Sequence, residues 1–380
     1  DGAAGAHERT GDDQHRVVQR ETDAGCRPAR VAVEHRDHHR HVGAADRDDD
    51  QHAQHEGDRR HQPEGRPALG GREPDAAQQH GNGQDEVECM LAGKDDGRAL
   101  EQAELVLARQ LAECRPQHGE VVLLFQPAEE TGQGAKAVIS DPKFKDIVPD
   151  TAYGLHNLPG FAKGQVLIRK GCFAAASFGM KMVFEGKTAH ASQPETGKSS
   201  SELLALLIHQ LEKKREMLHA VKPLTTFVIT HARLGEATFG VAPGFAELWL
   251  TLRSFDDRHL ELLANEVAEM CRAKAKNHLF DFRFSMHEAF SATNNNDNNV
   301  NLIENAATQL GLSVGYLTEP FRWSEDFGRF GQICPTGFFG LGSGLEQPAL
   351  HDARFDFPDD ILQTGIALFD RIIRLEAEGH

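Results

Sequence analysis

Aromatic residues and isoleucine are missing from the first third of the chain. Residues 1–124 contain no Phe, Tyr, Trp or Ile, although the whole chain has 22 Phe, 2 Tyr and 2 Trp. The first lysine is Lys94, and residues 1–93 are instead rich in His, Arg, Gln, Asp, Gly and Ala. Such a stretch buries too little apolar surface to offset its chain entropy. We therefore expect poor order over residues 1–95.

Three interpretations of residues 1–100 remain open. The segment is a disordered polar tail, a His-rich metal-binding tract, or an off-frame translation of a GC-rich stretch. Lys, Ile, Phe and Tyr have A/T-rich codons, so their joint absence favours the third interpretation. Tracts such as His35–His41 have no repeating ligand spacing, which weakens the idea of a metal-storage protein.

Other absences narrow the class of protein. No run of 18 apolar residues exists, and the first 30 residues lack the apolar stretch of a signal peptide. The chain has 41 Lys and Arg against 58 Asp and Glu, which argues against nucleic acid or an anionic membrane as a partner. None of the 6 Cys forms a Cys-x-x-Cys pair, so we expect reduced thiols in a cytoplasmic protein rather than a disulfide framework.

From about residue 101 the pattern is that of a folded α/β protein. Buried strands are predicted at Glu120–Phe125, Thr151–Leu155 and Gly337–Leu341, and helices at Ala103–Ala112, Val300–Leu310 and Asp360–Glu376.

The middle of the chain has its own order of elements. Strand, helix, strand, strand, helix and strand are predicted at Phe178–Glu185, Ser200–Met217, Thr226–Ala232, Phe245–Leu252, Arg258–His278 and Phe280–His287. This is the split βαβ order of a ferredoxin-like domain. We therefore predict an α/β fold of two domains. A mainly parallel-sheet domain comprises residues 101–176 and 291–380, and an α+β domain of residues 177–290 is inserted into it.

At three places in the chain, residues of catalytic or metal-binding types follow an apolar run. Glu129 and Glu130 follow the strand that ends at Phe125, His156 follows Leu155, and His351 follows a third run. Ligands of α/β sheets collect at strand ends. In extended backbone the two glutamates would point opposite ways, so that one faces a metal and the other an attacking water. Each feature alone is compatible with a structural role, but together they predict that Glu130, His156 and His351 converge.

Five motifs carry a family resemblance. They are Leu124–Glu130, Gly154–Asn157, Gly186–Ala191, Ser324–Phe327, and His351 with Phe355–Pro358. In order and spacing they resemble the aminoacylase/carboxypeptidase metallopeptidase family, in its branch of hippurate hydrolases and auxin-conjugate amidohydrolases.

The resemblance implies a role for each matched residue. Glu129 matches the general base, while Glu130, His156 and His351 match metal ligands. His190 matches a histidine that reaches an active site across a homodimer and stabilises the oxyanion. The resemblance thus implies that residues 101–176 and 291–380 form the catalytic domain and that residues 177–290 form a lid that also serves dimerisation. Two substrate-binding positions follow as well, because Arg253 matches the arginine that binds the substrate carboxylate and Gly240 stands where the family usually has asparagine. The implied cofactors are two divalent ions, Zn or Mn, Ni or Co, whose oxygen and nitrogen ligands suit such metals.

One departure from the family weakens the metal site. A Cys-Gly-His-Asp ligand motif would fall near residue 94, where this chain reads Ala92-Gly93-Lys94-Asp95-Asp96-Gly97. With three side-chain ligands left, at most one ion is expected. The leading hypothesis is a metal-dependent amidohydrolase of N-acyl amino acids or small peptides, impaired in this chain. The alternative is a catalytically inactive relative that binds a ligand or a partner.

Overall fold

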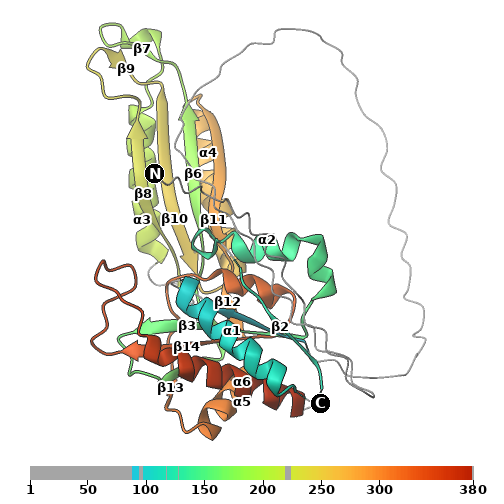
Figure 1. Ribbon diagram of the computed structural model, residues 1–380. Coiled ribbons are helices and arrows are strands. Elements are labelled where there is room, and N and C mark those ends of the chain that lie inside the picture. Colours follow the sequence, from blue (N-terminus) through green and yellow to red (C-terminus); the bar gives the residue numbers. More distant parts are fainter. Residues whose placement is uncertain (1–87, 94–96, 117, 127, 219–223, 379–380) are drawn as a thin grey trace, which may run out of the picture.

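The computed structural model describes residues 88–93, 97–116, 118–126, 128–218 and 224–378, with side chains from Leu105 onward (Figure 1). The described residues form two domains that combine helices and strands, each built around its own β-sheet. Within it, no helix combines the length and the apolar character needed to span a membrane.

The larger sheet has six strands in the order β13-β4-β14-β3-β1-β2. All neighbouring strands are parallel except β4 and β14. The strands are β1 (Glu88–Gly93), β2 (Glu120–Leu123), β3 (Thr151–Pro159), β4 (Val166–Ile168), β13 (Val314–Tyr316) and β14 (Thr336–Gly344). Because β3 and β14 are buried along nearly their whole length, both faces of the sheet must be covered.

Helices cover the two faces of this sheet. One apolar cluster joins the sheet to α1 (Gly97–Glu113), α5 (Asp297–Gln309) and α6 (Leu362–Glu378). A second cluster joins it to α2 (Gly134–Ser140) and to the 3₁₀ helix η4 (Asp326–Gln332). The short strands β5 (Gly171–Ala174) and β12 (Thr293–Asn295) pair beside the point where the chain leaves and re-enters this domain.

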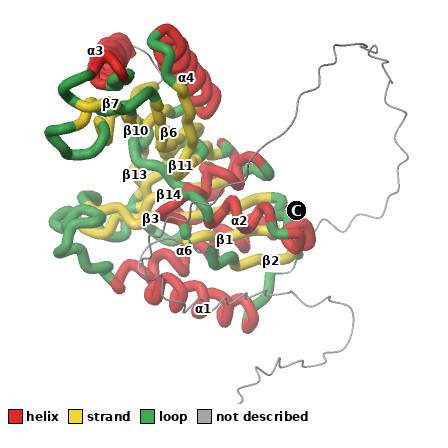
Figure 2. The backbone as a smooth tube through the Cα atoms, turned by 90° about the horizontal axis from the view of Figure 1, so that it is seen from above, coloured by secondary structure: helices red, strands yellow, loops and turns green. Residues whose placement is uncertain are grey.

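The inserted domain, here called the lid, runs from Ala176 to Phe290. Its antiparallel sheet has the order β11-β6-β10-β8, formed by β6 (Ala176–Glu185), β8 (Thr225–Leu234), β10 (Phe245–Ser254) and β11 (Asp281–Phe290). Helices α3 (Ser201–Leu218) and α4 (Asp257–Asn277) pack on the same face (Figure 2). The predicted ferredoxin-like order is confirmed. A two-stranded ribbon of β7 (Ala189–His190) and β9 (Val241–Ala242) forms the end of the lid farthest from the large sheet (Figure 1).

Three local predictions were wrong. Residues 88–93, within the segment expected to be poorly ordered, form β1 in register with both β2 and β3. The remainder of that prediction, residues 1–87 and 94–96, lies outside the described residues. Strand β3 continues to Pro159, so His156 lies inside a strand and not after it. Finally, Glu129–Thr131 forms a 3₁₀ turn, η1, instead of extended backbone.

Candidate functional site

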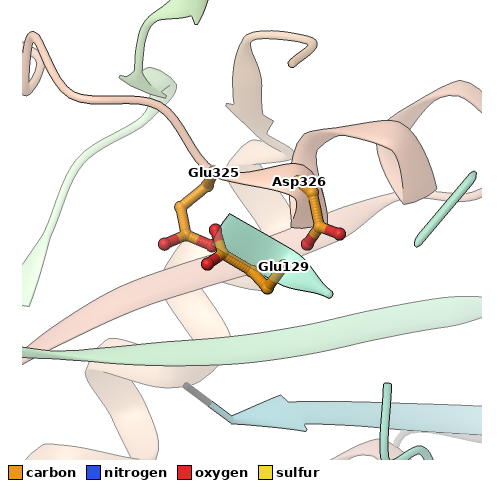
Figure 3. A group of neighbouring side chains, drawn as sticks. All are labelled: Glu129, Glu325 and Asp326. Carbon is orange, nitrogen blue, oxygen red and sulfur yellow. The ribbon is translucent and has the colours of Figure 1, made fainter. Parts of the chain in front are cut away.

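Three acidic side chains meet at one edge of the large sheet. Glu129, Glu325 and Asp326 each offer a carboxylate oxygen, and these oxygens lie within 4.8 Å of one another (Figure 3). Glu129 opens η1 just after β2, while Glu325 and Asp326 lie at the start of η4. Glu325 and Asp326 are buried and Glu129 is partly buried. We call these three residues the acidic group.

The turn before Glu129 sends the two neighbouring glutamates to different environments. Ala128 has a φ of 59°, a left-handed conformation that costs a non-glycine residue roughly 1 kcal/mol or more. Glu129 follows this sharp turn into the acidic group, whereas Glu130 is exposed on the outside of η1. The two glutamates therefore differ in burial, and the backbone between them is a 3₁₀ turn.

His156 lies beside the acidic group. Its Nδ1 is 2.7 Å from the carbonyl oxygen of Asn157, so Nδ1 carries the proton that is donated to this acceptor. The Nε2 atom lies 3.6 Å from Oε1 of Glu325, and both side chains are 3% exposed. The imidazole also packs on Trp323, with 5.0 Å between ring centroids. A histidine whose Nδ1 is held by a backbone carbonyl presents Nε2 for metal ligation.

Asp326 is tied to the scaffold. Its carboxylate accepts a hydrogen bond of 2.8 Å from the backbone N–H of Ala135 and one of 2.5 Å from Nε2 of Gln126. These bonds join η4 to the first turn of α2 and to the segment after β2. Asp326 therefore fixes the positions of Glu325 and Glu129 relative to each other, with less freedom to act as a ligand itself.

The other predicted ligands lie outside the acidic group. Glu130 is exposed, and so is His351, which has a φ of 65° in the loop after β14. The roles of Glu130 and His351 as metal ligands stay predictions.

His190 and Gly240 lie together at the far end of the lid. His190 pairs with Val241 in the β7–β9 ribbon, and the N–H of Ala191 donates to the carbonyl of Gly240 over 3.0 Å. This ribbon lies at the end of the lid that is farthest from the large sheet (Figure 1). The space around Gly240 is open, because a Cβ atom added there would meet no atom within 4 Å.

Arg253 lies at the opposite end of the lid sheet, next to the large domain. Its Nη1 donates to the carbonyl of Arg322 over 2.9 Å and to Oγ of Ser324 over 3.0 Å. Burial lowers the pKa of Arg253, but a guanidinium stays protonated at neutral pH.

Among the residues that the structure describes, the donor set at this site suits a divalent ion. Three carboxylates crowded at a buried edge repel one another, and a cation relieves this repulsion. Glu325 offers oxygen donors and His156 offers a nitrogen donor, and the carboxylate of Glu129 lies close to that of Glu325. Residues 92–97, which include the last two residues of β1, supply neither Cys nor His. Gly93 pairs with Leu155, one residue before His156.

Sequence reasoning underestimated Glu325, Asp326 and Trp323. Glu325 and Asp326 appeared only as part of a family motif, without a role of their own, and Trp323 did not appear at all. The available signal was the Glu325-Asp326 pair, which follows Phe321 and Trp323 with Ser324 between them.

The fold and the site define a two-domain α/β metallohydrolase, and comparisons with known proteins agree. The chain matches the model of peptidase family M20/M25/M40 over residues 91–375, and it belongs to this family. It is by that membership a metallohydrolase of amide or peptide bonds.

Individual relatives are distant. The chain is 25% identical over 273 residues to a hippurate hydrolase of Campylobacter jejuni, covering 70% of each chain. It is 26% identical over 259 residues to an uncharacterized hydrolase of Staphylococcus aureus, covering 67% of each.

Two solved structures share the fold. One is a dinuclear metal binding peptidase of the M20 family from Bacillus subtilis, with a TM-score of 0.62, 18% identity, and coverage of 77% of this chain and 82% of that one. The other is an aminobenzoyl-glutamate utilization protein from Klebsiella pneumoniae, with a TM-score of 0.59, 19% identity, and coverage of 76% and 70%.

Proposed function

We propose that this chain is a weakened amidohydrolase that cleaves N-acyl amino acids or small peptides with the help of a single divalent ion. The observation that carries the proposal is the acidic group with His156 at its side, at the edge of a sheet of the M20 fold. Its oxygen and nitrogen donors suit Zn, Mn, Ni or Co. When bound, such an ion would supply polarisation of the scissile carbonyl and a lowered pKa for the attacking water.

The chain's own residues divide the remaining work. Glu129 is placed to take a proton from the attacking nucleophile and return it to the leaving amine. His156 keeps its proton on Nδ1 and donates it in a hydrogen bond to the carbonyl of Asn157, which holds the ring in one orientation. Asp326 holds Glu325 and Glu129 together through Gln126 and Ala135.

We further propose that two copies assemble through their lids. His190 and Gly240 lie at the end of the lid that points away from their own acidic group, so within one chain they cannot share a substrate with Glu129. In a homodimer the ribbon of one copy would instead complete the site of the other. This arrangement would give His190 its expected role beside the oxyanion, and it would bring the open position at Gly240 toward the substrate carboxylate.

A second candidate function follows from the missing ligands. Because residues 92–97 contain neither Cys nor His, the chain is also compatible with a relative that binds an N-acyl amino acid without cleaving it.

Metal analysis and hydrolysis separate the two candidates. The full chain is dialysed against zinc, manganese or cobalt, its metal content is measured, and release of amino acid from a panel of N-acyl amino acids such as hippurate is followed. We expect at most one ion per chain and slow, metal-dependent turnover that Glu129→Gln abolishes while metal stays bound. Binding of hippurate by calorimetry without any turnover would favour the second candidate. Two tightly held ions with rapid hydrolysis would contradict the impaired site.

A further inference from the structure

The segment Phe321–Asp326, here called the strap, runs between the lid and the acidic group. At its start, the N–H of Phe321 donates to the carbonyl of Phe173 over 2.8 Å, and the N–H of Ala175 donates to the carbonyls of Phe321 and Trp323. Phe321 and Trp323 stack with 4.7 Å between their ring centroids. The strap therefore lies beside residues 173–175, where the chain passes from β5 into β6, the first strand of the lid.

Neighbouring residues of the strap contact different domains. Trp323 and Glu325 both face His156, which belongs to strand β3 of the large domain. Ser324, between them, contacts the lid instead. This alternation is what extended backbone produces, and Glu325 has a φ of −134° and a ψ of 141°.

Ser324 takes part in a short chain of hydrogen bonds with the lid. Nη1 of Arg253 donates to Oγ of Ser324 over 3.0 Å, and Oγ of Ser324 donates to Oγ of Ser177 over 2.7 Å. Arg253 and Ser177 are directly paired across β10 and β6, so they move as one piece of the lid sheet. Arg253 also holds the carbonyl of Arg322 over 2.9 Å, which fixes the strap on both sides of Trp323.

We propose that Ser324 is a positioning residue through which the lid sets the placement of Trp323 and Glu325 against His156. A shift of the lid sheet moves Ser177 and Arg253, and these two partners pull the strap with them. Glu325 is one residue from Ser324, and its carboxylate lies 3.6 Å from Nε2 of His156. The orientation of the lid is thus transmitted to Glu325 by these hydrogen bonds. The geometry of the strap stands independently of the proposed function, although its consequence for catalysis rests on that function.

Trp323 provides a direct readout, because the chain has only one other tryptophan, Trp249. In a Trp249→Phe background, emission from the metal-free full chain reports the strap alone. The variants are Ser177→Ala, which changes only the lid, Ser324→Ala, and Ser324→Thr, which keeps the hydroxyl. Ser285→Ala is the matched control, since Ser285 is an exposed serine of the same sheet whose hydroxyl bonds to His287.

Loss of one such hydrogen bond should raise the population with a displaced strap about fivefold. We therefore expect Ser177→Ala and Ser324→Ala to increase acrylamide quenching of Trp323 and to shift its emission to the red. Ser324→Thr and Ser285→Ala should match the parent, and circular dichroism melting identifies any variant that is unfolded. If Ser324→Ala does not fold, Ser177→Ala and Ser324→Thr still decide the question.

Quenching in Ser177→Ala equal to that of Ser285→Ala would overturn the proposal. A failure of the parent to bind zinc or to hydrolyse hippurate would count against the proposed function alone, because the fluorescence is measured without metal.

Discussion

The Nε2 atom of His156 and the Oε1 atom of Glu325 lie 3.6 Å apart in a site where both side chains are almost completely buried. Since Nδ1 of His156 donates to Asn157, Nε2 of the neutral ring is an acceptor, and it faces a carboxylate. A divalent ion placed between two such acceptors would be held by both, and it would also neutralise the repulsion within the acidic group.

The substitution Glu325→Gln tests this relationship. The amide can donate to Nε2 of His156, and one of three crowded negative charges is removed. Without metal, we expect a gain of about 1 kcal/mol in stability, which corresponds to a rise of roughly 2–4 °C in the melting temperature. In excess zinc, the rise in melting temperature caused by the bound ion should be smaller than in the parent, because the variant has lost a metal ligand. Melting in EDTA and in excess zinc measures both effects. Glu319→Gln, an exposed acidic residue just before the strap, is the control. A lower melting temperature in EDTA with unchanged zinc stabilisation would contradict the prediction.

Two substitutions should restore the missing ligands. Ala92-Gly93-Lys94-Asp95 becomes Cys-Gly-His-Asp in the double variant Ala92→Cys, Lys94→His. Gly93 pairs with Leu155 at the end of β1, so this segment follows the strand next to His156. We expect a second bound ion and an increase in hydrolysis of at least about a hundredfold, because the added ion contributes several kcal/mol of stabilisation to the transition state. Metal content and kcat/KM are measured together. The single variant Ala92→Cys is the control. An unchanged metal content in the double variant would contradict the placement of the ligand motif at residues 92–95.

Much of the fold was predictable because its signals are local. The lid elements follow from alternating and helical apolar patterns, and each strand of the lid sheet begins within a few residues of its predicted start. Strand β1 was missed for the opposite reason. Its sequence, Glu88 to Gly93, is short and lies next to a polar region, and only its pairing with β2 and β3 identifies it as a central strand.

The candidate site was harder to predict because its members come together only in the tertiary structure. Glu129 and His156 stood out as chemically active types at the ends of apolar runs. The acidic group, however, depends on the left-handed turn at Ala128 and on the hydrogen bonds that Asp326 receives from Gln126 and Ala135. No pattern along the chain encodes these long-range contacts.

Subunit complementation tests the proposed dimer. In the Cys-Gly-His-Asp variant, His190→Ala removes the lid histidine and Glu129→Gln removes the base. If His190 completes the site of the other copy, each variant alone is inactive, but a hybrid contains one intact site. Mixing equal amounts under dissociating conditions should therefore recover about a quarter of the parent activity, since half of the dimers are hybrids with one of two sites restored. Mixing Glu129→Gln with itself is the control. Absence of any recovery in confirmed hybrids would show that His190 does not act across the dimer.

Glu247 gives a prediction about pH, independent of the candidate site. On the open face of the lid sheet, its carboxylate lies 2.8 Å from Nζ of Lys181 and accepts a hydrogen bond of 2.7 Å from Nε1 of Trp249. Burial by itself would raise the pKa of Glu247, but the bonds from Lys181 and Trp249 outweigh it, and the pKa falls below its ordinary value of 4.5. Since the folded pKa lies below the unfolded one, the stabilisation is present above pH 4.5 and is lost as the pH falls through the folded pKa.

The variant Glu247→Gln should therefore lose about 1–2 kcal/mol of stability at pH 7, the usual scale for a hydrogen bond to a charged group. The difference from the parent should shrink progressively below pH 4.5, where the parent carboxylate becomes protonated as well. Urea unfolding at pH 7 and pH 3.5 measures both values. Glu185→Gln is a matched control on the neighbouring strand, because Glu185 forms a more exposed ion pair with Arg283 and should change stability by less than about 1 kcal/mol. A deficit in Glu247→Gln that is equally large at both pH values would assign its effect to packing rather than to charge.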